Sequence, residues 1–261
     1  MNYAKKSLGQ NFLIDKNIIN KIINLVDIKN KNIIEIGPGK GALTDLLLLK
    51  KPKSLIIIEK DFKLYKKLKF EYTNNKKVIV YNADILKFKL EKIIKNNSII
   101  FGNLPYNISS QILVKILRLK KKLSTYSDLI LMFQKELGDK ITGKFPSAHY
   151  GRLSILSNYK LNIIKKFQVS PNCFLPKPKV TSLVIHFQPK KKFTFNIKDL
   201  INLEKITNIL FSNKRKMINK NIKKLFTDEE IKIIKDINLN NRPSEIKPEI
   251  YYKITELFEK K

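Results

Sequence analysis

Apolar residues along the first half of the chain recur in a pattern that predicts alternating helices and strands. In residues 15–26 they fall three and four positions apart, which places them on one helix face, and Asp15 is a favourable N-cap residue. Short apolar runs follow at intervals. We expect strands at residues 32–36, 55–59, 78–81, 98–101 and 129–133, and helices at residues 43–49, 62–72 and 109–117, the last of these capped by Ser109 or Ser110.

The apolar runs are continuous and do not alternate with polar residues, which is typical of strands buried on both faces of a parallel sheet. Strands and helices that alternate in this way indicate a doubly wound, Rossmann-like α/β domain. Residues 180–187 form a later β pattern, which we expect at an antiparallel edge of the sheet. After residue 190 only helical patterns remain, at residues 200–226, 228–237 and 248–258. We therefore predict an α/β domain at residues 1–190 and a small all-helical domain at residues 191–261.

Glycine and acidic residues stand at the carboxyl ends of three predicted strands, where open parallel sheets bind ligands. Gly37, Gly39 and Gly41 follow the first strand, so the backbone can turn sharply and approach a ligand without a Cβ in the way. Glu59 ends the second strand, where a carboxylate can accept from both hydroxyls of a ribose. Asp84 follows the third and can accept from an adenine amino group. Singly, each feature also fits an ordinary turn or a solvated acid; together they indicate a nucleoside ligand without phosphates.

The segment Asn103-Leu104-Pro105-Tyr106 follows the fourth strand and resembles the motif of methyltransferases that act on exocyclic amino groups of bases. The amine of adenine is a poor nucleophile because its lone pair is delocalised into the ring. The Asn103 side-chain oxygen and the Leu104 carbonyl can each accept one N–H and so direct the lone pair at a methyl donor. Pro105 stiffens the turn, and Tyr106 offers an aromatic face to a base taken out of its stack. This chemistry requires no general base.

The composition of the chain also indicates a polyanionic partner. The formal net charge is +31, from 53 Lys+Arg against 22 Asp+Glu, which favours nucleic acid. A general bias towards Lys, Asn and Ile would give the same excess, so charge alone supports RNA binding only moderately. The densest basic stretches are Lys5-Lys6, Lys120-Lys121-Lys122, Lys190-Lys191-Lys192 and Lys214-Arg215-Lys216.

The few cysteine and histidine residues exclude other classes of site. One cysteine, Cys173, and two histidines, His149 and His186, exclude a disulfide framework and a Cys/His zinc site, so we expect no metal. Neither histidine has a catalytic context, and Cys173 is expected to be a small buried apolar residue. No run approaches the roughly 20 apolar residues of a membrane-spanning helix. We expect a monomeric cytoplasmic protein without a membrane partner.

Six segments together resemble the ribosomal RNA adenine dimethyltransferase family, and most of all its small-subunit dimethyladenosine transferases: residues 9–13, 35–44, 103–109, 134–136, 150–154 and 174–180. The resemblance covers nearly the whole chain. It implies that S-adenosylmethionine is the cofactor. It also implies that the substrate is a pair of adjacent adenines in the hairpin near the 3′ end of small-subunit ribosomal RNA, each of which receives two methyl groups on N6, with a role in small-subunit biogenesis.

The resemblance also implies roles for individual residues. The cofactor-binding set is Asn11, Leu13, Gly37, Gly39, Glu59, Asp84 and Asn103. Phe174 would lie on the face of the flipped adenine opposite Tyr106, although a phenylalanine of the core is an equally good interpretation. Lys214, Arg215 and Lys216 match a basic motif of the family's helical domain, where they would hold RNA phosphates without reading bases.

Two other functions remain open from the sequence. A macrolide-resistance methyltransferase would act on large-subunit RNA with the same fold, but Leu104 and the Lys-Arg-Lys cluster favour the small-subunit enzyme. A ribosome-assembly or transcription factor could keep the fold for RNA binding alone. Intact Gly37, Glu59 and Asp84 argue against such a loss of catalysis.

Overall fold

The structure is a computed structural model that describes residues 4–5, 8–119 and 126–261. The chain folds into two compact units. The first comprises Met1–Gly138 and Asn162–Pro189, and the second comprises Asp139–Leu161 and Lys190–Lys261. The second unit thus contains the residues expected in a helical domain and, in addition, a stretch taken from the middle of the α/β sequence.

A seven-stranded sheet forms the first unit, in the order β4-β3-β2-β5-β6-β9-β7. The strands are β2 (Asn32–Ile36), β3 (Ser54–Glu59), β4 (Val78–Asn82), β5 (Ser98–Asn103), β6 (Tyr126–Gln134), β7 (Leu161–Val169) and β9 (Ser182–Pro189). Strands β2 to β6 run parallel to one another, whereas β9 is antiparallel to β6, with Met132 opposite Val184. All five predicted parallel strands are confirmed, and their carboxyl ends meet at one edge of the sheet.

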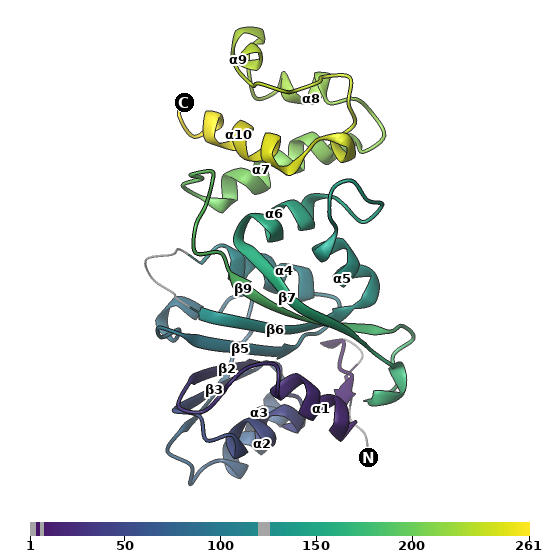
Figure 1. Cartoon of the computed structure of the whole chain (residues 1–261). Helices are drawn as coiled ribbons and strands as arrows, with labels where there is room; N and C mark the ends of the chain where they lie inside the picture. The colour runs from purple at the N-terminus through teal and green to yellow at the C-terminus, as the bar shows by residue number, and fades with distance from the viewer. Residues whose placement is uncertain (1–3, 6–7, 120–125) are drawn as a thin grey trace. The chain divides into compact units, whose positions relative to one another are not determined.

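One hydrophobic core lies between the sheet and the three helices α1 (Lys16–Ile23), α2 (Ala42–Leu49) and α3 (Phe62–Glu71). Figure 1 shows these helices on one face of the sheet and α4 (Ser109–Leu117) on the other. Ile22, Leu47 and Leu68 bring the three helices into contact with strand residues such as Ile57 and Phe101. The predicted N-cap of α1 is confirmed, because the Asp15 side chain accepts from Ile18 N at 2.9 Å.

Several sequence predictions for the first unit are wrong in detail. β4 is an edge strand with Ile79 exposed, so it is not buried on both faces as its apolar run suggested. β9 does not form the edge, because the unpredicted and largely exposed β7 lies outside it. Ser109 does not cap α4. Ile108 occupies the cap position, and the Ser109 hydroxyl donates instead to the Tyr106 carbonyl at 3.2 Å.

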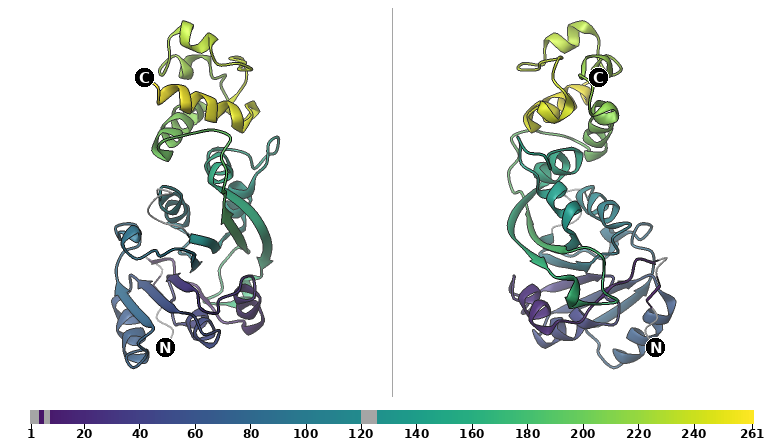
Figure 2. Two further views of the ribbon diagram at one scale, coloured as in Figure 1. Left: turned by 60° about the vertical axis from the view of Figure 1, so that its left-hand side comes forward. Right: turned by 90° about the vertical axis from the view of Figure 1, so that its right-hand side faces the viewer.

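The second unit is helical, and after residue 190 its chain contains only helices and loops (Figure 2, green to yellow). Its elements are α6 (Arg152–Lys160), α7 (Leu200–Leu210), η4 (Phe211–Asn213), α8 (Asn219–Ile222), α9 (Asp228–Lys232), η5 (Pro243–Glu245) and α10 (Pro248–Phe258), while α5 (Lys135–Thr142) crosses the boundary in sequence. The single helix predicted over 200–226 is wrong. Ser212 bonds back to the Ile209 carbonyl and Ile218 N bonds to Asn241 O, so the backbone leaves the helical path between them.

Buried tyrosines connect the two stretches of chain that form the second unit. The Tyr150 hydroxyl donates to the Ile246 carbonyl at 2.8 Å, and the Tyr252 hydroxyl donates to the Ile155 carbonyl at 3.0 Å. Each side chain therefore combines apolar burial with a satisfied polar end. Among the described residues, no helix is long and apolar enough to span a membrane.

Candidate active site

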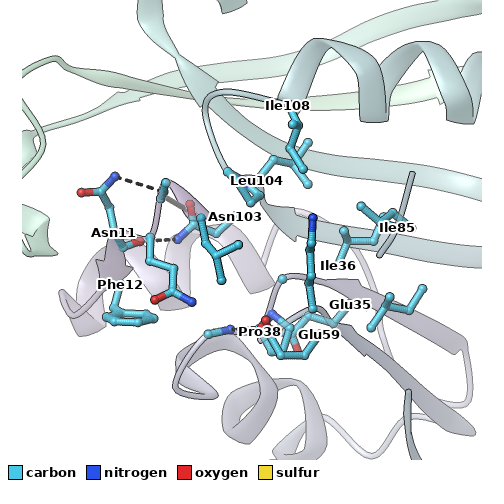
Figure 3. Close-up of a pocket in the computed structure, with 18 of the residues that line it drawn as sticks. Asn11, Phe12, Glu35, Ile36, Pro38, Glu59, Ile85, Asn103, Leu104 and Ile108 are labelled. Atoms are coloured by element: carbon cyan, nitrogen blue, oxygen red, sulfur yellow. Dashed lines mark hydrogen bonds between the residues drawn. The ribbon is translucent and has the colours of Figure 1, made fainter. Parts of the chain in front are cut away.

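A pocket lies at the carboxyl ends of β2, β3, β4 and β5 (Figure 3). Its lining includes ten of the residues singled out in the sequence: Asn11, Leu13, Gly37, Gly39, Glu59, Asp84, Asn103, Leu104, Pro105 and Tyr106. These residues come from five separate segments of the chain. The parallel sheet brings them together because each segment follows or flanks the same edge.

The glycine-rich turn after β2 forms the floor of the pocket. Gly37 and Gly39 have φ values of +69° and +60°, which side chains with a Cβ rarely adopt. Space is also short, since a Cβ on Gly39 would lie 2.7 Å from a ring carbon of Phe12. Gly37 N donates to Ile58 O at 3.0 Å, which ties the turn to the end of β3. At Gly37 and Gly39 the turn therefore offers bare backbone to a ligand, while Pro38 and Lys40 between and after them also line the pocket.

The pKa values of two carboxylates at neighbouring strand ends are shifted in opposite directions. Glu59 is buried, which raises its pKa, although its oxygens accept from Asp61 N at 2.7 Å and from Gly39 N at 3.3 Å. The hydrogen bond from the Lys60 ammonium, at 2.9 Å, lowers the pKa of Asp84. Asp84 is therefore an ionised acceptor at neutral pH.

Glu35 is a pocket residue that the sequence interpretation missed. It lies inside β2 with an exposed fraction of 1%. One of its oxygens accepts from the Thr44 hydroxyl at 2.7 Å, and the other has no hydrogen-bond partner among the described residues. Burial raises the pKa of Glu35 to about 8. A buried carboxyl oxygen without a hydrogen-bond partner in a pocket wall points to a ligand that supplies the partner. Glu35 stands inside a run of apolar residues, so nothing in the sequence indicated that it would face a ligand.

Asn103 is held in one orientation by the N-terminal segment. Its side-chain nitrogen donates to the Asn11 carbonyl at 3.1 Å, a contact drawn as a dashed line in Figure 3. This assigns the other amide atom as oxygen, and no described residue donates to it. The oxygen is thus available to accept an N–H from a substrate. A carbonyl oxygen in this position is what the sequence prediction for an adenine amine requires.

Tyr106 stands on the loop between β5 and α4. Its hydroxyl lies 2.6 Å from the Ser182 hydroxyl at the start of β9, and burial raises its pKa, so it is a neutral phenol. Leu104 is buried at the same loop and also lines the pocket. With its hydroxyl anchored, the ring of Tyr106 has a fixed position at the pocket wall.

Phe174 does not line the pocket. It is 2% exposed and belongs to the core that contains Leu13, Val169 and Cys173. It lies in β8 (Phe174–Leu175), which pairs with β1 (Phe12–Leu13) so that Phe174 is opposite Leu13. The structure therefore places it as a core residue beneath the N-terminal segment, the second of its two interpretations.

Lys214, Arg215 and Lys216 are exposed in a turn between η4 and α8, so their predicted position within a helix is wrong. Arg215 and Lys216 line a surface groove with three further cations, Lys220, Lys224 and Arg242, and one acid, Glu245. Lys6 and Lys120–Lys122 lie outside the described residues.

The described residues contain no cluster of three His, Cys, Asp or Glu side chains suited to a metal ion. His186 is buried and pairs with Asp128 at 2.7 Å between β6 and β9, away from the residues that line the pocket. Cys173 is buried, as predicted. His149 is exposed.

Comparison with known proteins agrees with this geometry. The model of the family described as ribosomal RNA adenine dimethylase matches residues 1–260. The chain is 46% identical to the ribosomal RNA small subunit methyltransferase A of Pelagibacter ubique over 98% of its own length and 97% of the relative's. The corresponding protein of Malacoplasma penetrans is 41% identical, over 97% and 91% of the two chains.

Solved structures show the same fold. The crystal structure of a dimethyladenosine transferase from Plasmodium falciparum superposes with a TM-score of 0.79 at 23% identity, covering 95% of this chain and 98% of the other. The 23S rRNA methyltransferase ErmE superposes with a TM-score of 0.69 at 22% identity, covering 95% and 100%. The Rossmann-like methyltransferase fold predicted from the sequence is confirmed. The chain belongs to the ribosomal RNA adenine dimethylases, enzymes that use S-adenosylmethionine to methylate adenine.

Proposed function

We propose that this enzyme transfers four methyl groups to N6 of two adjacent adenines in the 3′-terminal hairpin of small-subunit ribosomal RNA, during assembly of the small subunit. The names of the relatives from Pelagibacter ubique and Malacoplasma penetrans support the small subunit as the target. The observation that carries the chemistry is the orientation of Asn103, whose side-chain oxygen is left for a substrate N–H. The resemblance of the sequence to small-subunit dimethyladenosine transferases supports the number and position of the methyl groups.

The pocket fits S-adenosylmethionine on three observations. Gly37 and Gly39 leave the backbone bare where a Cβ would fill the space. Glu59 stands where it can accept from the ribose hydroxyls, and ionised Asp84 can accept from the adenine amino group. The partnerless oxygen of Glu35 complements the ammonium of the methionine moiety. Leu13 and Leu43 add apolar wall for the adenosyl group, which carries no phosphates.

The bound cofactor supplies an electrophilic methyl group on a sulfonium. The protein then has to position the amine and exclude water. Asn103 and the Leu104 carbonyl accept the two N–H groups of the adenine amine, which turns its lone pair out of the ring. Tyr106 stacks on the base and Pro105 fixes the turn that carries both. Alignment of this kind can remove roughly 7–11 kcal/mol from a barrier.

The second methylation needs a different set of contacts. A monomethylated amine keeps one N–H, so Asn103 and the Leu104 carbonyl can no longer both be satisfied. Each methyl transfer leaves a positive charge on the nitrogen and makes its remaining N–H acidic. The nitrogen then loses one of its own protons to solvent, and no described side chain has to take it as a general base.

RNA phosphates would bind the basic groove of the second unit. Lys214, Arg215 and Lys216 lie at an exposed turn, and the groove beside them carries Lys220, Lys224 and Arg242. Contacts of this kind position the RNA without reading its sequence. Sequence selectivity then rests on the hairpin's shape and on which adenines reach Tyr106.

Primer extension on RNA from unmethylated small subunits, incubated with enzyme and S-adenosylmethionine, tests the target. Dimethylated adenines stop the polymerase, and we expect two adjacent stops in the 3′-terminal hairpin. Large-subunit RNA in the same assay is the control. Stops there and none in small-subunit RNA would instead assign the chain a macrolide-resistance type of target. No stops in either RNA, despite cofactor binding, would favour an RNA-binding factor without catalysis.

A further inference from the structure

The N-terminal residues 8–13, which we call the strap, cover one side of the cofactor pocket. All six line it, and Asn11 and Phe12 are labelled beside it in Figure 3. The strap is fixed at its far end by the β1–β8 pair and in its middle by the Asn11–Asn103 hydrogen bond. It also lies directly on the Tyr106 loop, since a Cβ on Gly9 would approach the Asn107 side-chain oxygen to 3.1 Å.

The near end of the strap is tied to Asp61. Oδ2 of Asp61 accepts from the Lys5 ammonium at 2.9 Å and from Gln10 Nε2 at 3.3 Å, while Oδ1 accepts from Lys63 N at 2.9 Å. Lys5 and Gln10 are also joined to each other, because Lys5 N donates to the Gln10 side-chain oxygen at 2.8 Å. We call Lys5, Gln10 and Asp61 the clasp. Both of its donors to Oδ2 come from the N-terminal segment.

Asp61 is a buried carboxylate that depends on these donors. Its side chain is 2% exposed, whereas that of Lys5 is 44% exposed. Burial acts to raise the pKa of Asp61, but the hydrogen bonds from Lys5 and Lys63 hold it below its ordinary value. An ionised group so deeply buried is costly when its partners leave. An open clasp is therefore unfavourable.

The clasp is also linked to the residue that would accept the ribose. Asp61 N donates to Glu59 Oε1 at 2.7 Å, and the other oxygen of Glu59 accepts from Gly39 N. The strap, Asp61, Glu59 and the glycine-rich turn thus form one connected hydrogen-bonded path around the pocket. Movement of the strap would disturb the position of Glu59.

We propose that Asp61 is a positioning residue for cofactor binding, and that it holds the strap closed over the pocket through Lys5 and Gln10. The β1–β8 pair at the other end has two residues in each strand, too few to keep a strand pair ordered without further contacts. The clasp supplies those contacts. Release of the cofactor then requires the Lys5–Asp61 pair to open, so the clasp sets the affinity and lifetime of bound cofactor. While cofactor is bound the strap is closed and Asn11 keeps Asn103 in place, so the methyl-transfer step is unchanged.

The variants Lys5→Met and Asp61→Asn test the proposal. Asparagine at position 61 still accepts from Lys63 N and caps α3, so this variant removes the charge and keeps the helix start. Lys16→Met, at an exposed lysine of α1, is the control for the first. Asp27→Asn is the control for the second, because Asp27 also accepts from a backbone N–H two residues on, at 3.0 Å, but lies on the surface outside the pocket.

Calorimetry should give a dissociation constant for S-adenosylmethionine raised about threefold to tenfold in Lys5→Met and about tenfold or more in Asp61→Asn, with both controls unchanged. The dissociation rate should rise in parallel, and kcat at saturating cofactor should stay within about twofold. Because Lys5 and Asp61 act through one contact, the double variant should be little worse than Asp61→Asn. Cofactor should protect the lysine-rich N-terminus from trypsin in the wild type and not in the clasp variants.

Wild-type affinity in Asp61→Asn would overturn the proposal, as would fully additive effects in the double variant. A lower melting temperature with unchanged cofactor affinity would also overturn it, since Asp61 would then be only structural. The binding measurements need no RNA. A negative result for the clasp can therefore be distinguished from a failure to find methylated adenines in small-subunit RNA.

Discussion

At the scale of single residues, the pocket holds three carboxyl groups that burial and neighbours have made different. Glu59 and Asp84 could be predicted because each stands at the end of an apolar run, where the sheet exposes side chains to ligand. Glu35 could not, because it lies within β2 and only the structure shows that one of its oxygens lacks a donor. The place of Asn103 in the pocket was also predictable, but the contact that orients its amide, with Asn11, joins residues 92 positions apart.

Asp84→Ala should weaken binding of S-adenosylmethionine by about 1–3 kcal/mol, because a buried amino donor loses its acceptor. Calorimetry on the cofactor alone measures this. Lys60→Met is the matched control, since it removes the ammonium that pairs with Asp84 and keeps the carboxylate. Unchanged affinity in Asp84→Ala would remove this residue from the adenine site.

Glu35 should make the cofactor-free protein less stable as pH rises. Its pKa is raised from 4.5 to about 8 on folding, so the folded state holds a proton that the unfolded state releases. The contribution of Glu35 to the free energy of unfolding is present in full below about pH 4.5 and is lost as the pH rises to about 8. The loss is no more than about 1.4 kcal/mol per pH unit. Glu35→Gln carries no titrating group, so denaturant unfolding between pH 5 and 8 should show a flatter profile. A parallel profile would contradict the buried, protonated state.

Tyr106→Ala should reduce methylation while cofactor affinity stays unchanged. Stacking of a base on an aromatic ring is worth about 1–3 kcal/mol, and this variant removes the ring. Tyr106→Phe is the matched control, because it keeps the ring and loses only the hydroxyl bond to Ser182. Steady-state methylation of small subunits, with calorimetry for the cofactor, separates the two effects. A loss of cofactor affinity alone would mean that Tyr106 supports the pocket and does not handle the base.

At the scale of elements, the parallel strands and the first helices followed from the sequence because apolar periodicity there matches burial. The edge was less predictable. β7 has the burial pattern of a largely exposed strand, and Lys165 and Lys166 in its centre interrupt its apolar residues. Its sequence therefore lacks the continuous apolar run by which the buried strands were predicted. The end of α7 was missed for another reason. Its apolar spacing continues past Leu210, but hydrogen bonds of Ser212 and Asn241 take the backbone away.

Phe174→Ala tests the element that supports the strap. The ring lies in the core against residues such as Leu13 and Val169, so its removal should cost about 3–5 kcal/mol of folding stability. Phe174→Leu keeps most of the apolar volume and should cost less than about 1.5 kcal/mol. Denaturant unfolding checks both. If Phe174→Ala is as stable as the wild type and loses methylation, the ring acts on the flipped base after all.

At the scale of the whole molecule, a net charge of +31 gives a strong general attraction to RNA, and specific contacts add to it. Lys214, Arg215 and Lys216 lie together in an exposed turn, so their contribution to RNA binding can be measured apart from this general attraction. Replacing all three with Gln should weaken subunit binding at any target sequence and lower the salt dependence by roughly one unit of slope per lost phosphate contact. Binding titrations at several salt concentrations measure both.

The matched control replaces Lys50, Lys51 and Lys53 with Gln, which removes the same charge from the chain segment between α2 and β3. Methyl transfer at saturating RNA should survive in both triple variants. Equal effects on affinity and salt slope would mean that the Lys214–Lys216 cluster contributes only its share of the general charge.

The helical unit is made from two separated stretches of the chain, and this limits how the gene can be divided. A cut at residue 190 would leave residues 139–161 attached to the α/β unit, with Tyr150 and Ile155 deprived of Ile246 and Tyr252. A ribosome would likewise complete the sheet strands β7 and β9 before the helical unit had received its second half. Recombination between relatives could exchange the helical unit intact only through three simultaneous junctions, at residues 139, 161 and 190, so the two units are expected to be inherited together.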